Sequence, residues 1–153
     1  MEKERTLVFV KPDGVARRLV GEVVGRLERK GLALVGMKMM RLSREQAERH
    51  YAPLADKPFY PGLIRFITSG PVVAMVWEGP RAIAQVRAVM GATDPLQAVP
   101  GSIRGDLGLD VGRNVVHGSD GPESAAREIA NVFSPDEIVG GPLPDEAWLV
   151  EPA

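Results

Sequence analysis

The chain has 153 residues, of which 44% are hydrophobic and 25% charged, as expected for one globular domain with a buried core. With 19 basic and 20 acidic residues the net charge is −1, so the chain lacks the positive field of a general nucleic-acid binder, and we expect no sequence-specific nucleic-acid partner. No cysteine is present, which excludes disulfides, cysteine metal sites and cysteine nucleophiles.

The N-terminal part of the chain predicts a strand, a turn and a helix. Residues 6–10 are dense in Val, Leu and Phe and favour a strand, and Lys-Pro-Asp-Gly at 11–14 favours a turn. The following helix carries Leu19, Val23 and Leu27 on one stripe, and Gly31 ends it. No signal-peptide pattern and no apolar run of membrane-spanning length is present, so we expect a cytoplasmic protein without membrane contact.

The next segment predicts a strand at residues 32–42 and then two helices. Ser43 and Gln46 form a capping-box pattern at the start of the first helix. His50, near the end of that helix, has no partner motif, and we predict that it lies on the surface. A break at 55–58 precedes a second short helix at 59–67.

The central segment, residues 72–77, is apolar throughout and predicts a strand buried on both faces. A helix at 81–90 follows, with Arg87 at the edge of its apolar stripe. Residues 91–113 contain prolines and several glycines and predict a long irregular loop, which in a compact domain usually serves function.

The last segment predicts a short strand at residues 115–116 and a helix at 121–132. Asp120 is the predicted N-cap of that helix, with Glu123 as its capping-box partner. In the proline-containing tail, we predict that Trp148 anchors the chain.

This order of elements fits two architectures. Without the inserted helix pair and the last helix, it is the α+β, ferredoxin-like βαββαβ plan with a four-stranded antiparallel sheet. A parallel Rossmann-like sheet is the alternative, although the Gly-x-Gly-x-x-Gly motif that would support it is missing. No repeat or linker divides the sequence, so we expect one domain over residues 1–153.

His117 is the strongest candidate for chemistry, because it follows a short strand and has suitable neighbours. Gly118 leaves open space beside the ring. Ser119 and Glu128 can hold the imidazole in one tautomer, with the lone pair of the other nitrogen free. A neutral histidine of this kind is a nucleophile toward phosphorus, whereas the alternative is a structural histidine at a strand end.

A triphosphate substrate would also need cations and hydrogen-bond donors. Arg87 and Arg104 can clamp phosphate oxygens, and Tyr51 and Thr93 can donate hydroxyl bonds. Mg²⁺ held mainly by the substrate phosphates would neutralise the remaining charge without a protein metal site. Phe59 can stack on a base, and stacking tolerates every base because each has a π face. The sequence contains no P-loop, His-Arg-Asp or His-Glu-x-x-His motif, so none of these motifs indicates a different catalytic mechanism.

Several segments between residues 6 and 133 together resemble the nucleoside diphosphate kinase family. The most specific reads Asn114-Val115-Val116-His117-Gly118-Ser119-Asp120. Other segments match in register, at residues 10–15, 21–23, 57–59, 69–76, 91–95 and 100–106.

The resemblance implies a ping-pong kinase that moves the γ-phosphoryl group between nucleoside tri- and diphosphates such as ATP, GTP and deoxynucleotides, with Mg²⁺ as cofactor. The phosphoryl group would be carried on His117, and Lys11, Ser119 and Glu128 would complete the catalytic set. The phosphates would be bound by Tyr51, Arg87, Thr93 and Arg104. The base would contact Phe59, Leu63 and Val111, and the ribose would be bound by Lys11 and Asn114.

The resemblance also implies a homo-oligomer, either a hexamer or a tetramer, and the long tail favours the hexamer. We expect too few helices to cover both faces of the central strand, so part of that surface should lie between subunits. Leu27, Trp77 and the tail depart from the family pattern, which affects packing more than chemistry. Two other functions stay open: a phosphohistidine carrier that serves a protein acceptor, and a nucleotide-binding module without turnover.

Overall fold

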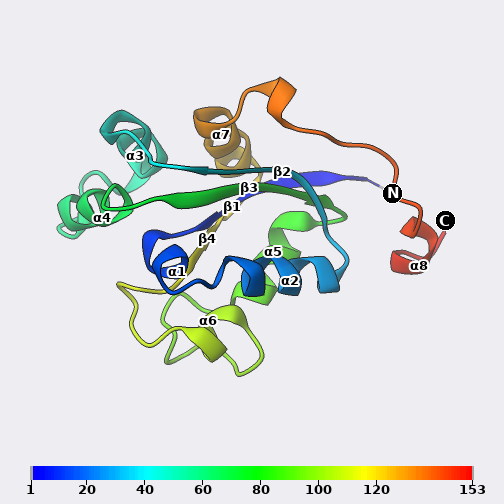
Figure 1. The fold of residues 1–153 in the computed structure, drawn as a ribbon, viewed down its shortest axis with the longest axis horizontal. Coiled ribbons are helices and arrows are strands. Elements are labelled where there is room, and N and C mark those ends of the chain that lie inside the picture. The colour runs from blue at the N-terminus through cyan, green and yellow to red at the C-terminus, as the bar shows by residue number, and fades with distance from the viewer. Residues whose placement is uncertain (1, 153) are drawn as a thin grey trace.

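The structure, a computed structural model, describes residues 2–152, so the two ends of the predicted domain, Met1 and Ala153, lie outside the described residues. Four antiparallel strands form one sheet in the order β2-β3-β1-β4 (Figure 1). The predicted ferredoxin-like α+β fold is confirmed, and the parallel alternative is wrong. The strands are β1 (Glu4–Val10), β2 (Ala33–Met40), β3 (Val72–Gly79) and β4 (Val116–Gly118).

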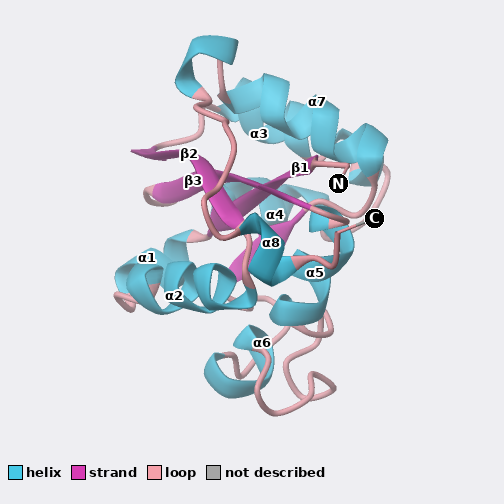
Figure 2. Cartoon of the chain, turned by 90° about the vertical axis from the view of Figure 1, so that its right-hand side faces the viewer, coloured by secondary structure: helices cyan, strands magenta, loops and turns pink. Residues whose placement is uncertain are grey.

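Helices cover both faces of this sheet. Figure 2 shows α3 and α7 on one side and α1, α2 and α5 on the other. The helices are α1 (Pro12–Ala16), α2 (Val20–Lys30), α3 (Arg44–His50), α4 (Tyr60–Ile67), α5 (Ala82–Met90), α6 (Ile103–Leu107), α7 (Pro122–Val132) and α8 (Glu146–Leu149), with short 3₁₀ turns at Ala52–Leu54 and Pro135–Glu137.

Two apolar cores lie on opposite faces of the sheet. Alternate residues of β1 point to opposite faces, so Val8 and Val10 pack with α2 and α5, whereas Leu7 and Phe9 pack with α3, α4 and α7. Every residue of β3 is buried within this single chain. The expectation that too few helices would cover the central strand is therefore wrong.

Local signals set the helix ends in two places. Gly31 ends α2 with φ 108°, a left-handed conformation that glycine adopts without steric cost. Ser43 and Gln46 form the predicted capping box of α3. The predicted cap of α7 is wrong: that helix begins one residue later, with Gly121 as N-cap and Pro122 in its first turn, and Asp120 does not cap it.

Other segments also differ from the prediction. Residues 12–14 are the start of α1 rather than a turn, and the long loop contains α6. The last strand extends to His117 and Gly118. Trp148 is 90% exposed, so it does not anchor the tail to this chain. In the part of the chain that the structure describes, no helix combines the length and apolarity needed to cross a bilayer.

Candidate active site

His117 lies on β4 beside Phe9 of β1, and its ring is held by one strong hydrogen bond. Its Nε2 is 2.7 Å from Oε1 of Glu128, and the hydroxyl of Ser119 donates to the same oxygen at 2.8 Å. Because a carboxylate only accepts, Nε2 carries the proton and Nδ1 keeps its lone pair. The three residues that the sequence grouped together are thus in direct contact.

Glu128, which bonds the imidazole, and Ser119, which bonds Glu128, are both fixed by buried structure. Ser119 is fully buried, and its hydroxyl accepts the backbone N–H of Leu7 at 3.3 Å. Glu128 lies on the inner face of α7 with Ala125 and Val132, and only 4% of it is exposed. The ring is therefore oriented by β1 and α7 together, before any substrate binds.

Burial and nearby cations keep the His117 ring neutral. Burial is the largest cause that lowers its pKa to about 3, and the charges of Lys11, Arg104 and Arg87 act in the same direction. Since the ordinary value is 6.5, the unprotonated form persists well below neutral pH. Burial also raises the pKa of Glu128. A neutral ring with a free Nδ1 is the form that can attack an electrophile.

Lys11 and Asn114 meet where β1 ends and β4 begins. Lys11 Nζ donates to Asn114 Oδ1 at 2.8 Å, and Asn114 Nδ2 donates to the carbonyl of Thr93 at 2.9 Å. Burial, and next the charge of Arg104, lower the pKa of Lys11 to about 8. The predicted ribose-binding pair is therefore one bonded unit, and the Thr93 contact uses its backbone while its side chain is exposed.

Two arginines lie beside this unit. Arg104 is 4% exposed and uses three of its five N–H groups on the carbonyls of Asn114, Gly91 and Val116, at 3.2, 3.3 and 2.7 Å. Arg87 reaches from α5 and donates to the carbonyl of Gly118 at 3.1 Å. Burial and the charge of Arg87 lower the pKa of Arg104 to about 10. Each guanidinium is held in place with donors left over for an anion.

Tyr51 caps the end of α3 and is buried, and burial raises the pKa of its hydroxyl. The predicted base-binding residues lie further out: Phe59 is 56% exposed, Val111 is 55% exposed, and Leu63 is half-buried. Phe59 and Leu63 are one turn apart at the start of α4. Of these three, Leu63 packs against the apolar core that contains Phe9 and Tyr51.

A tight connection between β1 and β4 was missed by sequence reasoning. Val115 has φ 74°, which is rare for a β-branched residue, and its N–H donates to Asp13 Oδ2 at 3.0 Å. The carbonyl of Val115 accepts the N–H of Lys11 at 2.9 Å. The Lys-Pro-Asp-Gly segment was the available signal, since Asp often bonds nearby backbone. These bonds bring the two strand ends together.

Gly118 has a different role from the predicted one. A Cβ there would lie 2.5 Å from Met90 Sδ and 3.1 Å from a methyl of Val86, both on α5. Because Gly118 has no side chain, α5 can pack closely against β4. The glycine therefore does not serve to leave space beside the imidazole.

His50 lies next to the candidate site, and sequence reasoning placed it wrongly. It is 3% exposed rather than on the surface, and its ring centroid lies 4.5 Å from that of His117. His50 lies three residues after Ala47 and one residue before Tyr51, and both of those residues are buried. This spacing puts His50 on the inner stripe of α3, and it was the signal in the sequence that could have predicted the burial.

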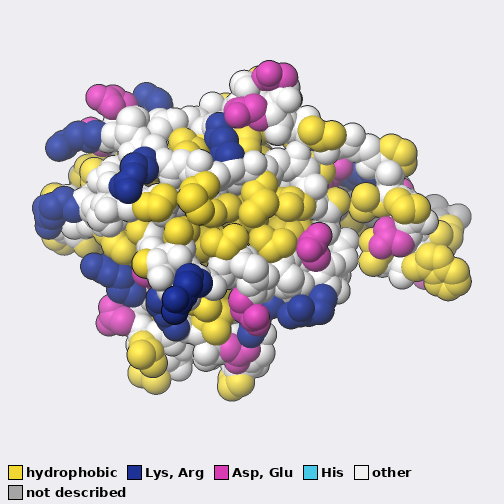
Figure 3. Space-filling view, viewed as in Figure 1, with side chains coloured by type: hydrophobic (Ala, Val, Ile, Leu, Met, Phe, Trp, Pro, Cys, Tyr) yellow, Lys and Arg dark blue, Asp and Glu magenta, His cyan; other side chains and the backbone are white. Residues whose placement is uncertain are grey.

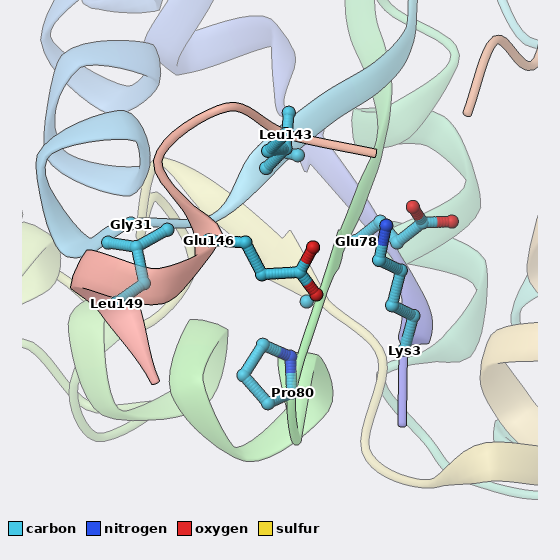
Figure 4. Close-up of a pocket in the computed structure, with 9 residues that line it drawn as sticks. Lys3, Gly31, Glu78, Pro80, Leu143, Glu146 and Leu149 are labelled. Carbon is cyan, nitrogen blue, oxygen red and sulfur yellow. The ribbon is translucent and has the colours of Figure 1, made fainter. Parts of the chain in front are cut away.

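Two cavities of the structure are lined by residues other than His117, Ser119 and Glu128. Figure 4 shows a small cavity between β3 and the tail, lined by Lys3, Glu78, Pro80 and Glu146 among others. Its volume of about 20 Å³ suits a single water molecule. A larger, open hollow of about 350 Å³ lies between α1 and the end of α4, with Arg113 at its edge. Neither is lined by His117, so we define the candidate site by its bonding geometry.

Comparisons with known proteins agree with this arrangement. The family model described as nucleoside diphosphate kinase matches residues 4–138. A nucleoside diphosphate kinase from Archaeoglobus fulgidus is 64% identical over 97% of this chain and 98% of its own length, and one from Carboxydothermus hydrogenoformans is 59% identical over 97% and 99%. A solved structure of a halophilic nucleoside diphosphate kinase from Halobacterium salinarum in complex with CDP has a TM-score of 0.94 at 55% identity, covering 98% of this chain and 100% of that one.

Proposed function

The chain belongs to the nucleoside diphosphate kinase family, and we propose that Nδ1 of His117 carries the phosphoryl group in its ping-pong transfer from a nucleoside triphosphate to a nucleoside diphosphate. The observation that carries this assignment is the 2.7 Å contact of Nε2 with Glu128. That contact occupies one ring nitrogen and leaves the other as the nucleophile. We further propose that residues 1–153 act as one catalytic domain in the cytoplasm.

In the first half-reaction, the Nδ1 lone pair forms a bond to the γ-phosphorus. The bond from that phosphorus to the bridging oxygen breaks, and its electron pair leaves with the nucleoside diphosphate. The imidazole keeps its Nε2 proton and gains a positive charge, which the carboxylate of Glu128 stabilises through the existing hydrogen bond. The second half-reaction reverses these events with another diphosphate. Orientation of this kind can lower a barrier by roughly 7–11 kcal/mol.

The second requirement for transfer is that the negative charge of the triphosphate is neutralised. In the proposal, Arg87, Arg104 and Tyr51 bind its phosphates, together with the hydroxyl of Thr93, through donors that the backbone leaves free. The family uses a divalent cation, and we propose Mg²⁺. The donors around His117 are mainly cationic, and Glu128 already accepts two hydrogen bonds, so the ion would be held mainly by the substrate phosphates. Bound there, Mg²⁺ supplies charge neutralisation.

One assay separates the proposed kinase from the two other functions. The enzyme is incubated with γ-labelled ATP and Mg²⁺, freed of nucleotide and then given GDP. Labelled protein that yields labelled GTP supports the kinase. Label that stays on the protein after GDP supports a carrier to another acceptor, and absence of label supports a binding module.

Replacing Glu128 with Gln should slow phosphorylation of His117 on the order of 10–100-fold, the range for partners that orient a functional histidine. A neutral amide cannot compensate the positive charge that the ring gains, and it can turn its NH₂ group toward Nε2. Nucleotide affinity should change little, because Glu128 is behind the ring. Single-turnover rates and binding constants for ATP test this. Weaker binding at an unchanged rate would contradict the orienting role.

Replacing Phe59 with Ala should weaken binding of every nucleotide by about 1–3 kcal/mol, the range for one base–aromatic stack. The ring is exposed at the start of α4, where a flat base can cover it. Titration with ADP, GDP, CDP and UDP measures the effect, and Leu96→Ala, a change of another exposed apolar residue outside the proposed site, serves as control. A loss restricted to one base would instead indicate hydrogen-bond recognition at this position.

We also propose that the protein is a homo-oligomer, and we favour the hexamer over the tetramer. Its support lies at the edge strand β2, where Met37 and Met39 are 46% and 63% exposed. Figure 3, in the view of Figure 1, shows a band of hydrophobic side chains along this edge. An open, apolar strand edge is a surface that proteins normally cover. Light scattering gives the assembly mass, and a monomer at micromolar concentration would refute the proposal.

A further inference from the structure

His50, the last residue of α3, is a buried polar side chain without a polar partner. It is 3% exposed, and neither ring nitrogen has a hydrogen-bond partner among residues 2–152. A buried polar group left unpaired costs stability, and each such group needs an explanation. An aliphatic residue would fill this position at lower cost, so packing alone does not account for an imidazole.

The surroundings of His50 connect it to the reacting ring. Its ring is edge-to-face with that of His117, at 4.5 Å between centroids and 75° between planes. It also lies 4.9 Å from Phe9 and 4.6 Å from Tyr51. The hydrogen bond to Glu128 fixes Nε2 of His117, but one bond does not fix the plane of the ring. The contact with His50 supplies a second constraint on that plane.

We propose that His50 is a positioning residue for phosphoryl transfer, whose neutral ring fixes the plane of the His117 imidazole. The inference rests on the proposed role of His117 as the nucleophile.

The charges around His50 keep it suited to this role. Burial is the main reason that its pKa lies well below the usual value, and His117 lowers it further. Arg127 and Lys11 act in the same direction, and Glu128 opposes them. A protonated His50 would repel the charged His117, so an uncharged ring is required. Its backbone is fixed as well, because its carbonyl accepts Nη1 of Arg127 at 3.3 Å.

A second use of the same side chains is a cation site. The possible ligand atoms of His50, His117 and Glu128 lie within 4.8 Å of one another. The positive charges of Lys11, Arg87 and Arg104, which disfavour a proton on His117, equally disfavour a metal ion there. The structure therefore favours a positioning role, and metal binding becomes an outcome of the test.

Two substitutions of His50 separate its ring from its volume. His50→Leu keeps an apolar filler without a ring, and His50→Phe keeps the aromatic contact without nitrogens. Phe133→Leu, in the same apolar core but away from His117, is the control for loss of a buried ring. Single-turnover phosphorylation by saturating γ-labelled ATP is measured with nucleotide affinity, melting temperature and the ¹⁵N shifts of His117.

His50→Leu should slow phosphorylation about 10-fold, at the lower end for an orienting partner, with nucleotide affinity nearly unchanged. Its ¹⁵N shifts should still show His117 with the proton on Nε2, because Glu128 is unchanged, so the slower rate reports the orientation of the ring rather than its tautomer. His50→Phe should restore most of the rate, and Phe133→Leu should lower the melting temperature without slowing transfer.

Three results would overturn the inference: an unchanged rate in His50→Leu, an equal loss in His50→Phe and His50→Leu, or an equal loss in Phe133→Leu. Inhibition of the native enzyme by micromolar Zn²⁺ that His50→Leu abolishes would assign a cation site instead. Absence of label on the native enzyme would refute the proposed function itself, which distinguishes the two failures.

Discussion

Replacing His117 with Ala should abolish both the phosphoenzyme and nucleotide exchange, with a loss on the order of 10⁶-fold, as for removal of other enzymatic nucleophiles. Neither of two described groups near this position can replace Nδ1: the hydroxyl of Ser119 is buried and bonded to Glu128, and both ring nitrogens of His50 are buried. Nucleotide binding should persist, because Lys11 and Arg104 are held by bonds that do not involve the imidazole.

The measurement is exchange of label from γ-labelled ATP to GDP, with binding of ADP as the control for an intact site. The label on native enzyme should also be released by acid and kept in base, as a phosphoramidate requires, whereas a phosphoserine resists acid. Exchange above background in the variant, or an acid-stable label on the native enzyme, would remove His117 from the proposed role.

Loss of the 3′-hydroxyl of the sugar should slow the chemical step by about 10²–10³-fold, the range for loss of one donor to a developing negative charge. In the proposal, Lys11 and Asn114 hold the ribose. Their mutual bond, at 2.8 Å, and the bond from Asn114 to Thr93 fix them before the sugar arrives. A hydroxyl held there can donate to the bridging oxygen as that atom gains charge. An interaction that strengthens in the transition state raises turnover and not only affinity.

Phosphorylation of His117 by ATP, 2′-deoxy-ATP and 3′-deoxy-ATP in a single turnover provides the test. The first two should react at similar rates, and the third should be slow even when saturating. If ATP and 3′-deoxy-ATP reacted equally fast at saturation, the hydroxyl would have no part in the chemistry. Lys11 and Asn114 would then serve ground-state binding alone.

The sequence predicted the fold where local signals decide the structure. Gly31 and the Ser43–Gln46 pair end and begin helices through bonds within a few residues, so their patterns were sufficient. The cap of α7 was wrong because two local signals compete there. Pro122 occupies the first turn and moves the N-cap to Gly121, which has no side chain to donate or accept.

The grouping of His117, Ser119 and Glu128 was predictable from the sequence, but other contacts around His117 were not. The order of His117, Ser119 and Glu128 along the chain allowed their grouping, since a strand end and the next helix are neighbours in sequence. The contact of His50 with His117 and the close approach of α5 to Gly118 depend on elements far away in the chain. The residue pattern of one helix cannot reveal which side chain from a distant part of the chain will pack against that helix.

The position of β1 between β3 and β4 has a consequence for how the protein folds. Thr6 pairs with Trp77, and Val8 pairs with Gly118, 110 positions later in the chain. Closing such long loops costs entropy before the new contacts compensate for it, so these pairings form slowly compared with helices. During synthesis, Lys11 cannot meet Asn114 and His117 until most of the chain has left the ribosome. Helical structure therefore precedes activity in refolding, and a nascent chain without its last strand binds no nucleotide productively.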